Sequence, residues 1–145
     1  MRRFLACVLA LPLFGCSREA STATTPATSF QPGQVWTYQT RPGEEASRII
    51  ICRVEKEPTL GEVVHIHING LRIKNKHAPD GLTPTVGHMP YTAEALRACL
   101  VKLESSGAPL PKFDDGYDEW KKAKGGAWTL PVKNAIAGMK ETLNK

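Results

Sequence analysis

Three consecutive segments with β-strand patterns constrain the fold of this chain more than any other feature. They cover residues 34–40, 47–56 and 62–73, and turns rich in Pro and Gly separate them. A fourth, short strand is predicted at 127–130. Connections this short favour antiparallel neighbours, so the sequence predicts a β-meander. In the third segment apolar and polar side chains alternate: Val64, Ile66 and Ile68 against His65, His67 and Asn69.

The second half of the chain has the spacing of helices. Apolar residues recur at helical intervals in 92–104 and 132–143, and residues 114–124 read as a short helix with two aromatic side chains on one side. Thr92 is placed to cap the first of these helices. Residues 74–91 lack periodicity and are predicted to form a long loop. Strands followed by helices predict an α+β fold, a meander of three or four strands packed with two or three helices.

The N-terminal residues carry the features of a secretion signal. Two arginines precede an apolar run over residues 4–14, which is too short to cross a hydrocarbon layer of about 30 Å. The run closes with the sequence Leu13-Phe14-Gly15-Cys16. This sequence resembles the lipobox of bacterial lipoproteins. The resemblance implies cleavage before Cys16 and attachment of acyl chains to Cys16.

The same resemblance sets the expected domain organisation. Residues 1–15 are the signal peptide, and residues 16–33 are the lipidated cysteine followed by a flexible stalk of Ser, Thr, Ala and Pro. Residues 34–145 then form a single small globular domain. Lipoproteins with serine after the cysteine, here Ser17, are generally carried to the outer membrane. We therefore expect a lipid anchor in the outer membrane and a domain that faces the periplasm.

The charge balance disfavours a nucleic-acid partner. The chain has 19 basic and 14 acidic residues. Two of the basic residues lie in the signal peptide, which leaves 17 against 14 in the mature chain. The basic residues are scattered among acidic ones and form no block of the kind that binds phosphate backbones.

Two cysteines remain once the signal peptide and the acylated cysteine are set aside. Cys52 lies within a predicted strand, and Cys99 lies on the apolar face of a predicted helix. In an oxidising compartment the two can form a disulfide. The alternative is a pair of buried free thiols, because free cysteine is among the most buried residue types. The sequence leaves both alternatives open.

Two histidines at neighbouring positions of one strand face are the sharpest metal-binding candidate. His65 and His67 project from the same side of their strand, and a Zn²⁺ site needs a third ligand from His77, His88 or a carboxylate. Histidines on the wetter face of a meander are more often solvated, so the sequence ranks metal binding as the weaker interpretation. No cofactor is predicted.

The candidate contact surface for a partner is the basic part of the long loop region. Arg72, Lys74, Lys76 and His77 lie close together there, in a segment with no structural periodicity. Surface loops of this kind carry a large share of binding sites. The partner expected from the sequence is a protein of unknown identity.

No motif supports catalysis. The chain has no nucleophile elbow and no phosphate-binding loop, so no catalytic residue is assigned and the protein is predicted to bind rather than to catalyse. A small domain on a lipidated stalk is typical of inhibitors and of immunity proteins that neutralise cell-wall-active toxins. The alternatives are a structural or assembly accessory of an envelope complex and, less favoured, a metal-dependent hydrolase that uses His65 and His67.

Overall fold

The structure is a computed structural model that describes residues 29–145. The predicted signal peptide, Cys16 and most of the predicted stalk lie outside these residues. Within them the chain forms β1 (Val35–Tyr38), β2 (Arg48–Glu57), β3 (Gly61–Asn69), β4 (Ile73–Lys74), β5 (Leu82–Thr83), β6 (Val86–Thr92), α1 (Ala93–Cys99), β7 (Leu100–Ser105), α2 (Asp114–Lys122) and α3 (Val132–Leu143).

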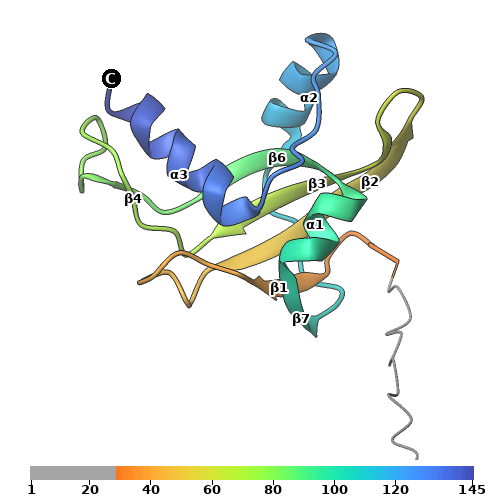
Figure 1. The fold of residues 1–145 in the computed structure, drawn as a ribbon, viewed down its shortest axis with the longest axis horizontal. Coiled ribbons are helices and arrows are strands. Elements are labelled where there is room, and N and C mark those ends of the chain that lie inside the picture. Colours follow the sequence, from red (N-terminus) through yellow and green to blue (C-terminus); the bar gives the residue numbers. More distant parts are fainter. Residues whose placement is uncertain (1–28) are drawn as a thin grey trace, which may run out of the picture.

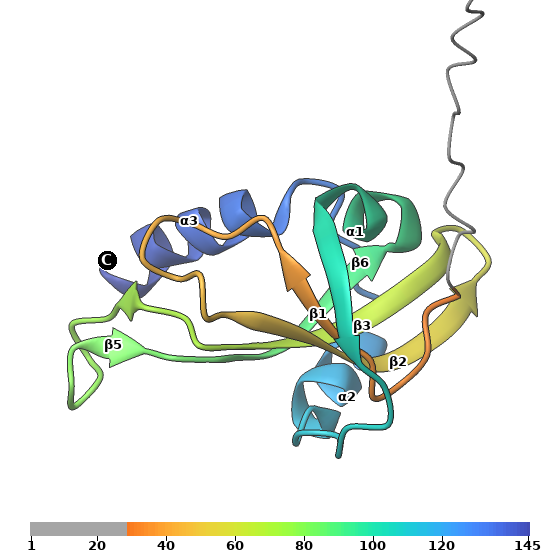
Figure 2. The ribbon, with the colours of Figure 1, turned by 90° about the horizontal axis from the view of Figure 1, so that it is seen from below.

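Five of the strands form one antiparallel sheet in the order β6-β3-β2-β1-β7. The first three strands pair as consecutive neighbours, as predicted. Strands β4 and β5 form a separate two-stranded hairpin inserted between β3 and β6. Helices α1 and α3 cover one face of the large sheet, and α2 lies against the other face (Figure 2). The predicted α+β class is confirmed.

The hydrophobic core lies between the sheet and helices α1 and α3. The predicted alternation in β3 holds, because Val64, Ile66 and Ile68 are fully buried in this core. They pack together with residues of β2 and with apolar side chains of both helices, among them Ile49, Ile51, Leu96, Val132, Ala135 and Ile136. The helix predicted at 132–143 has the bounds expected from its spacing.

The helix predicted at 92–104 is much shorter in the structure. Thr92 caps α1 as expected, and its side chain accepts a hydrogen bond from the amide of Ala95 at 3.3 Å. The helix ends at Cys99, and residues from Leu100 onward are extended as β7 and pair with β1. The apolar spacing fits both conformations over this stretch. The extended conformation is adopted because pairing with the open edge of β1 provides hydrogen-bond partners for the backbone N–H and C=O groups of both strands.

The prediction of a loop over residues 74–91 is wrong in part, because its end forms strand β6 of the main sheet. Strand β6 pairs with β3 even though it contains Gly87 and Pro90. Proline is tolerated because β6 is an edge strand. The strand predicted at 127–130 is reduced to one parallel bridge on the outer side of β6, where the amide of Trp128 donates to the carbonyl of Pro90 at 2.8 Å.

The third predicted strand ends four residues early, at a glycine. The chain leaves β3 at Gly70, whose φ of +68° belongs to the left-handed region. A Cβ at this position is 3.0 Å from the Cα of Ser47, so any other residue adds a tight backbone contact to the strain of the positive φ. At the other end, Phe30 is already buried in the core, so the packed part begins slightly before the predicted boundary at residue 34.

Candidate functional site

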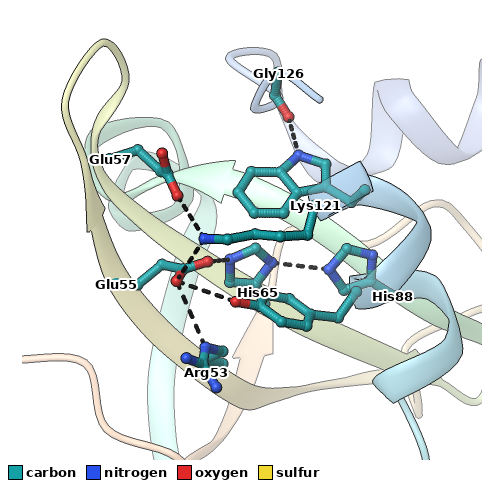
Figure 3. Close-up of polar contacts among 9 residues, drawn as sticks. Arg53, Glu55, Glu57, His65, His88, Lys121 and Gly126 are labelled. Atoms are coloured by element: carbon teal, nitrogen blue, oxygen red, sulfur yellow. Dashed lines mark hydrogen bonds and ion pairs between the residues drawn. The ribbon is translucent and has the colours of Figure 1, made fainter. Parts of the chain in front are cut away.

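Helix α2 is held on the sheet by polar and aromatic contacts rather than by buried apolar side chains. None of its residues is buried. Tyr117, Trp120 and Lys121 face the sheet and meet a group of ionisable side chains on β2, β3 and β6 (Figure 3). These side chains form one connected polar network on the α2 face of the sheet, which makes it a candidate site.

His65 is at the centre of this cluster and is completely buried, contrary to the prediction of a wetter strand face. Helix α2 covers it, and the rings of Tyr117 and Trp120 lie edge-on to the imidazole with centroids at 5.1 and 4.7 Å. Its Nδ1 is 2.8 Å from Nε2 of His88, and its Nε2 is 3.0 Å from Oε1 of Glu55. Sequence periodicity placed the side chain on the correct face but gave no indication of what covers that face.

The two imidazoles and the carboxylate form a directed hydrogen-bond chain. Glu55 accepts only, so His65 donates from Nε2, accepts at Nδ1 and receives the proton of His88 Nε2. Burial lowers the pKa of His65 to about 4, with a further contribution from His88, and burial lowers the pKa of His88 as well. Both rings are therefore neutral at pH 7.

Glu55 supplies the negative charge of the cluster. Burial acts to raise its pKa, but hydrogen bonds from Tyr117 and Lys121 outweigh burial and lower it. Lys121 also contacts Glu57 at 2.9 Å, and Arg53 approaches Glu55 at 3.7 Å. The network fixes α2 to β2 by charge-assisted hydrogen bonds.

The structure does not bring His65 and His67 together as a pair of metal ligands. Both ring nitrogens of His65 are engaged by His88 and Glu55, and the contact of 2.8 Å between the two imidazoles leaves no space for an ion between them. The Nδ1 of His67 lies 3.3 Å from the carbonyl of Gly87, so His67 takes no part in the hydrogen-bond chain of Glu55, His65 and His88. Among residues 29–145 no group of three or more His, Cys, Asp or Glu side chains has metal-binding geometry.

Cys52 and Cys99 are buried free thiols. Cys99 belongs to the core beneath α1, whereas Cys52 lies outside that core cluster although it is buried. The sheet places the two on different faces, which decides between the alternatives left open by the sequence. Burial raises the pKa of both thiols, that of Cys52 to about 11, so neither has appreciable thiolate character at neutral pH.

The predicted contact residues lie at the end of the molecule formed by α3 and β4. Arg72 and Lys74 line a hollow there together with Arg41 and Lys140, which come from the β1–β2 turn and from α3. Lys76 instead donates to the carbonyls of Asn144 and Lys145 and ties the hairpin to the end of α3. His77 is exposed in the hairpin turn and does not reach the hollow.

We call the four side chains Arg41, Arg72, Lys74 and Lys140 the cationic trough. All four line a hollow of about 330 Å³, and Arg41, Lys74 and Lys140 also line a second hollow of about 480 Å³. Sequence reasoning found Arg72 and Lys74 but missed the other two. Arg41 and Lys140 are remote in sequence, and no local signal shows that the β1–β2 turn and α3 meet at β4.

An apolar groove lies on the opposite flank of α3. It has a volume of about 700 Å³, and α3 forms one wall while β4, β5 and the start of β6 form the other. Trp128, in the groove wall, keeps 37% of its surface exposed. The groove is defined by the apolar side chains Ile73, Val86, Trp128, Leu130, Met139 and Leu143.

Comparisons with protein-family models, with curated proteins and with solved structures gave no match for this chain. Within residues 29–145, no helix has both the length and the apolar character needed to cross a membrane.

Proposed function

We propose that this protein is an envelope lipoprotein, anchored in the outer membrane through Cys16, whose periplasmic domain binds another protein. Its action is binding and not catalysis, as in an inhibitor or immunity protein directed against a cell-wall-active toxin. The binding surface is the α3–β4 end, which combines the apolar groove with the cationic trough.

The groove is the single observation that carries the proposal. Small domains rarely leave an apolar hollow of about 700 Å³ open, and such hollows mark ligand or partner sites. The walls of the groove belong to the fold, because Ile73 and Ala135 lie in the buried core and Met139 and Leu143 pack against it. The hollow between these walls is nevertheless open, so it can receive a partner.

The position of this surface agrees with a tethered binding module. The described chain starts at the end of the molecule opposite the C-terminal end of α3 (Figures 1 and 2). Near that start the guanidinium of Arg97 on α1 lies 4.7 Å from the ring centre of Phe30. An anchor that joins the domain through the residues before Phe30 therefore leaves the α3–β4 end free for a partner.

Site-specific photo-crosslinking in the native cells tests the binding surface. A photoreactive amino acid replaces Thr142, an exposed residue at the groove rim, and in a matched control it replaces Val101, which is 66% exposed on β7. We expect a discrete protein adduct from position 142 and none from position 101. The same adduct from both positions, or none from position 142, contradicts the proposed surface.

The anchor is tested separately by mass spectrometry of the mature N-terminus. We expect an acylated Cys16, and we expect Cys16→Ser to release the protein from the membrane fraction. An unmodified Cys16 in cells overturns the lipoprotein assignment and leaves the crosslinking result unaffected.

A further inference from the structure

We propose that the segment which binds the α3–β4 end is a polypeptide carrying acidic side chains beside apolar anchors. The apolar anchors enter the groove, and the acidic groups lie in the cationic trough. This inference rests on the proposed function and specifies the chemistry of the partner.

The trough holds more positive charge than its own carboxylates neutralise. Among residues 29–145, the side chains of Arg72, Lys74 and Lys140 have no carboxylate within 4.0 Å. Arg41 alone is paired, with Glu44. Cations gathered in one hollow repel one another, and a bound anion relieves that repulsion. The charge of the trough therefore favours an acidic ligand.

A buried carboxylate fixes the geometry of the trough. Glu44 is only 3% exposed, and it accepts from Nε of Arg41 at 2.8 Å and from the backbone amide of Arg72 at 2.6 Å. Burial acts to raise the pKa of Glu44, but these hydrogen bonds outweigh it and keep the group ionised. The β1–β2 turn and the residue before β4 are thus joined, and the guanidinium of Arg41 is held in place before a ligand arrives. Preorganisation of this kind reduces the entropic cost of binding.

The groove and the trough flank the same helix. Gly138, Met139 and Thr142 line the groove, whereas Lys140 and Glu141 line the trough side. A segment that crosses the C-terminal half of α3 therefore meets an apolar wall and a positive wall within one short contact. Buried apolar anchors supply affinity, while charge complementarity supplies orientation and a fast association rate.

A polypeptide fits this surface better than the anchoring membrane does. The α3–β4 end lies opposite the start of the described chain (Figure 1), so attachment of that start to a bilayer does not require contact between this end and the lipid. A phosphate-rich bilayer also offers no reason for an open apolar groove on the far side of α3 from the cations. Binding to anionic lipid is retained as an outcome of the experiment.

The probe is a display library of short random peptides, selected against the full-length protein in detergent. The trough variant is Arg72→Gln/Lys74→Gln/Lys140→Gln. Its matched control, with the same change in charge at exposed positions elsewhere, is Lys56→Gln/Lys102→Gln/Lys122→Gln. The groove variant is Gly138→Gln/Thr142→Gln, which adds polar side chains at exposed positions where a Cβ at Gly138 meets no neighbour.

We expect selected peptides to be enriched in Asp and Glu together with Leu, Phe or Trp. The trough variant should bind them about tenfold more weakly, the control should lose less than about twofold, and the wild-type affinity should fall with added salt. The groove variant should abolish selection of these peptides.

Two results overturn the inference and are distinguishable. Peptides without acidic residues that bind the trough variant normally, yet fail to bind the groove variant, refute the acidic partner and leave the proposed binding surface intact. Peptides that bind the groove variant as well as they bind the wild type refute the surface itself. Trough-dependent binding to vesicles of phosphatidylcholine and phosphatidylglycerol, with no peptide selected, assigns the trough to lipid and also refutes the inference.

Discussion

Lowering the pH should reduce the free energy of unfolding of the domain through His65, at pH values above those at which the carboxylates of the domain titrate. The imidazole is fully buried, and burial lowers its pKa from 6.5 to about 4. The unfolded chain therefore binds a proton between these pH values that the folded chain does not bind. By linkage, the free energy of unfolding is highest above about pH 6.5 and falls as the pH drops toward about 4.

The size of the effect follows from the shift in pKa. Each pKa unit corresponds to about 1.4 kcal/mol, so the shift of His65 is worth about 3 kcal/mol in total and about 2 kcal/mol by pH 5. His88, whose pKa is also lowered, adds a loss of the same sign. The lowered pKa of Glu55 matters only below its ordinary value of 4.5. The range from about pH 6.5 to about 5 thus isolates the histidines.

Urea unfolding monitored by tryptophan fluorescence measures this loss at a series of pH values. His65→Gln removes the titrating ring, and its stability should depend less on pH by about one proton per molecule. His77→Gln, at an exposed turn, is the control and should keep the wild-type pH dependence. The reasoning is refuted if His65→Gln retains the wild-type slope, or if NMR titration of the intact protein gives His65 a pKa near 6.5.

Two further predictions concern the backbone and the thiols. Gly70→Ala should lower the free energy of unfolding by about 1–3 kcal/mol, because φ is +68° and the added methyl meets Ser47. Gly138→Ala on the exposed side of α3 should raise the free energy of unfolding by about 0.5–1 kcal/mol. Equal effects of the two substitutions in denaturant titrations contradict this account. Cys52 and Cys99 should both be alkylated after unfolding without a reductant, and a crosslinked peptide containing the two in a mass map would show that the assignment as free thiols is wrong.

The strand pattern predicted most of the sheet because the alternation of β3 is a direct consequence of its two environments. Val64 and Ile66 pack against the helices, and the side chain between them lies on the other face. The sequence-based prediction was wrong where the same spacing of apolar residues fits both a helix and a strand. Leu96, Leu100 and Leu103 have helical spacing, yet only the first lies in a helix, because the open edge of β1 recruits the rest as β7.

The candidate site could be predicted only in part, because its members meet through tertiary structure. The basic residues of β4 are evident in the sequence, since they are close together along the chain. Their partners are not, because Arg41 precedes a turn and Lys140 reads as one more surface lysine of a helix. The same holds for His65, which is buried, because its partner His88 lies 23 residues away on the unpredicted strand β6.

Both faces of the sheet serve folding, and the proposed binding surface lies on the outer side of α3. Apolar packing beneath α1 and α3 covers one face, and the polar network beneath α2 covers the other. Neither of these involves Gly138, Lys140 or Thr142, which are exposed on α3. Substitutions there should consequently change binding, if the proposed surface is correct, while leaving the free energy of unfolding within about 0.5–1 kcal/mol of the wild-type value. Stability and the proposed binding are therefore separable at this helix, because Val132 and Ile136 fix it to the sheet and the exposed positions do not.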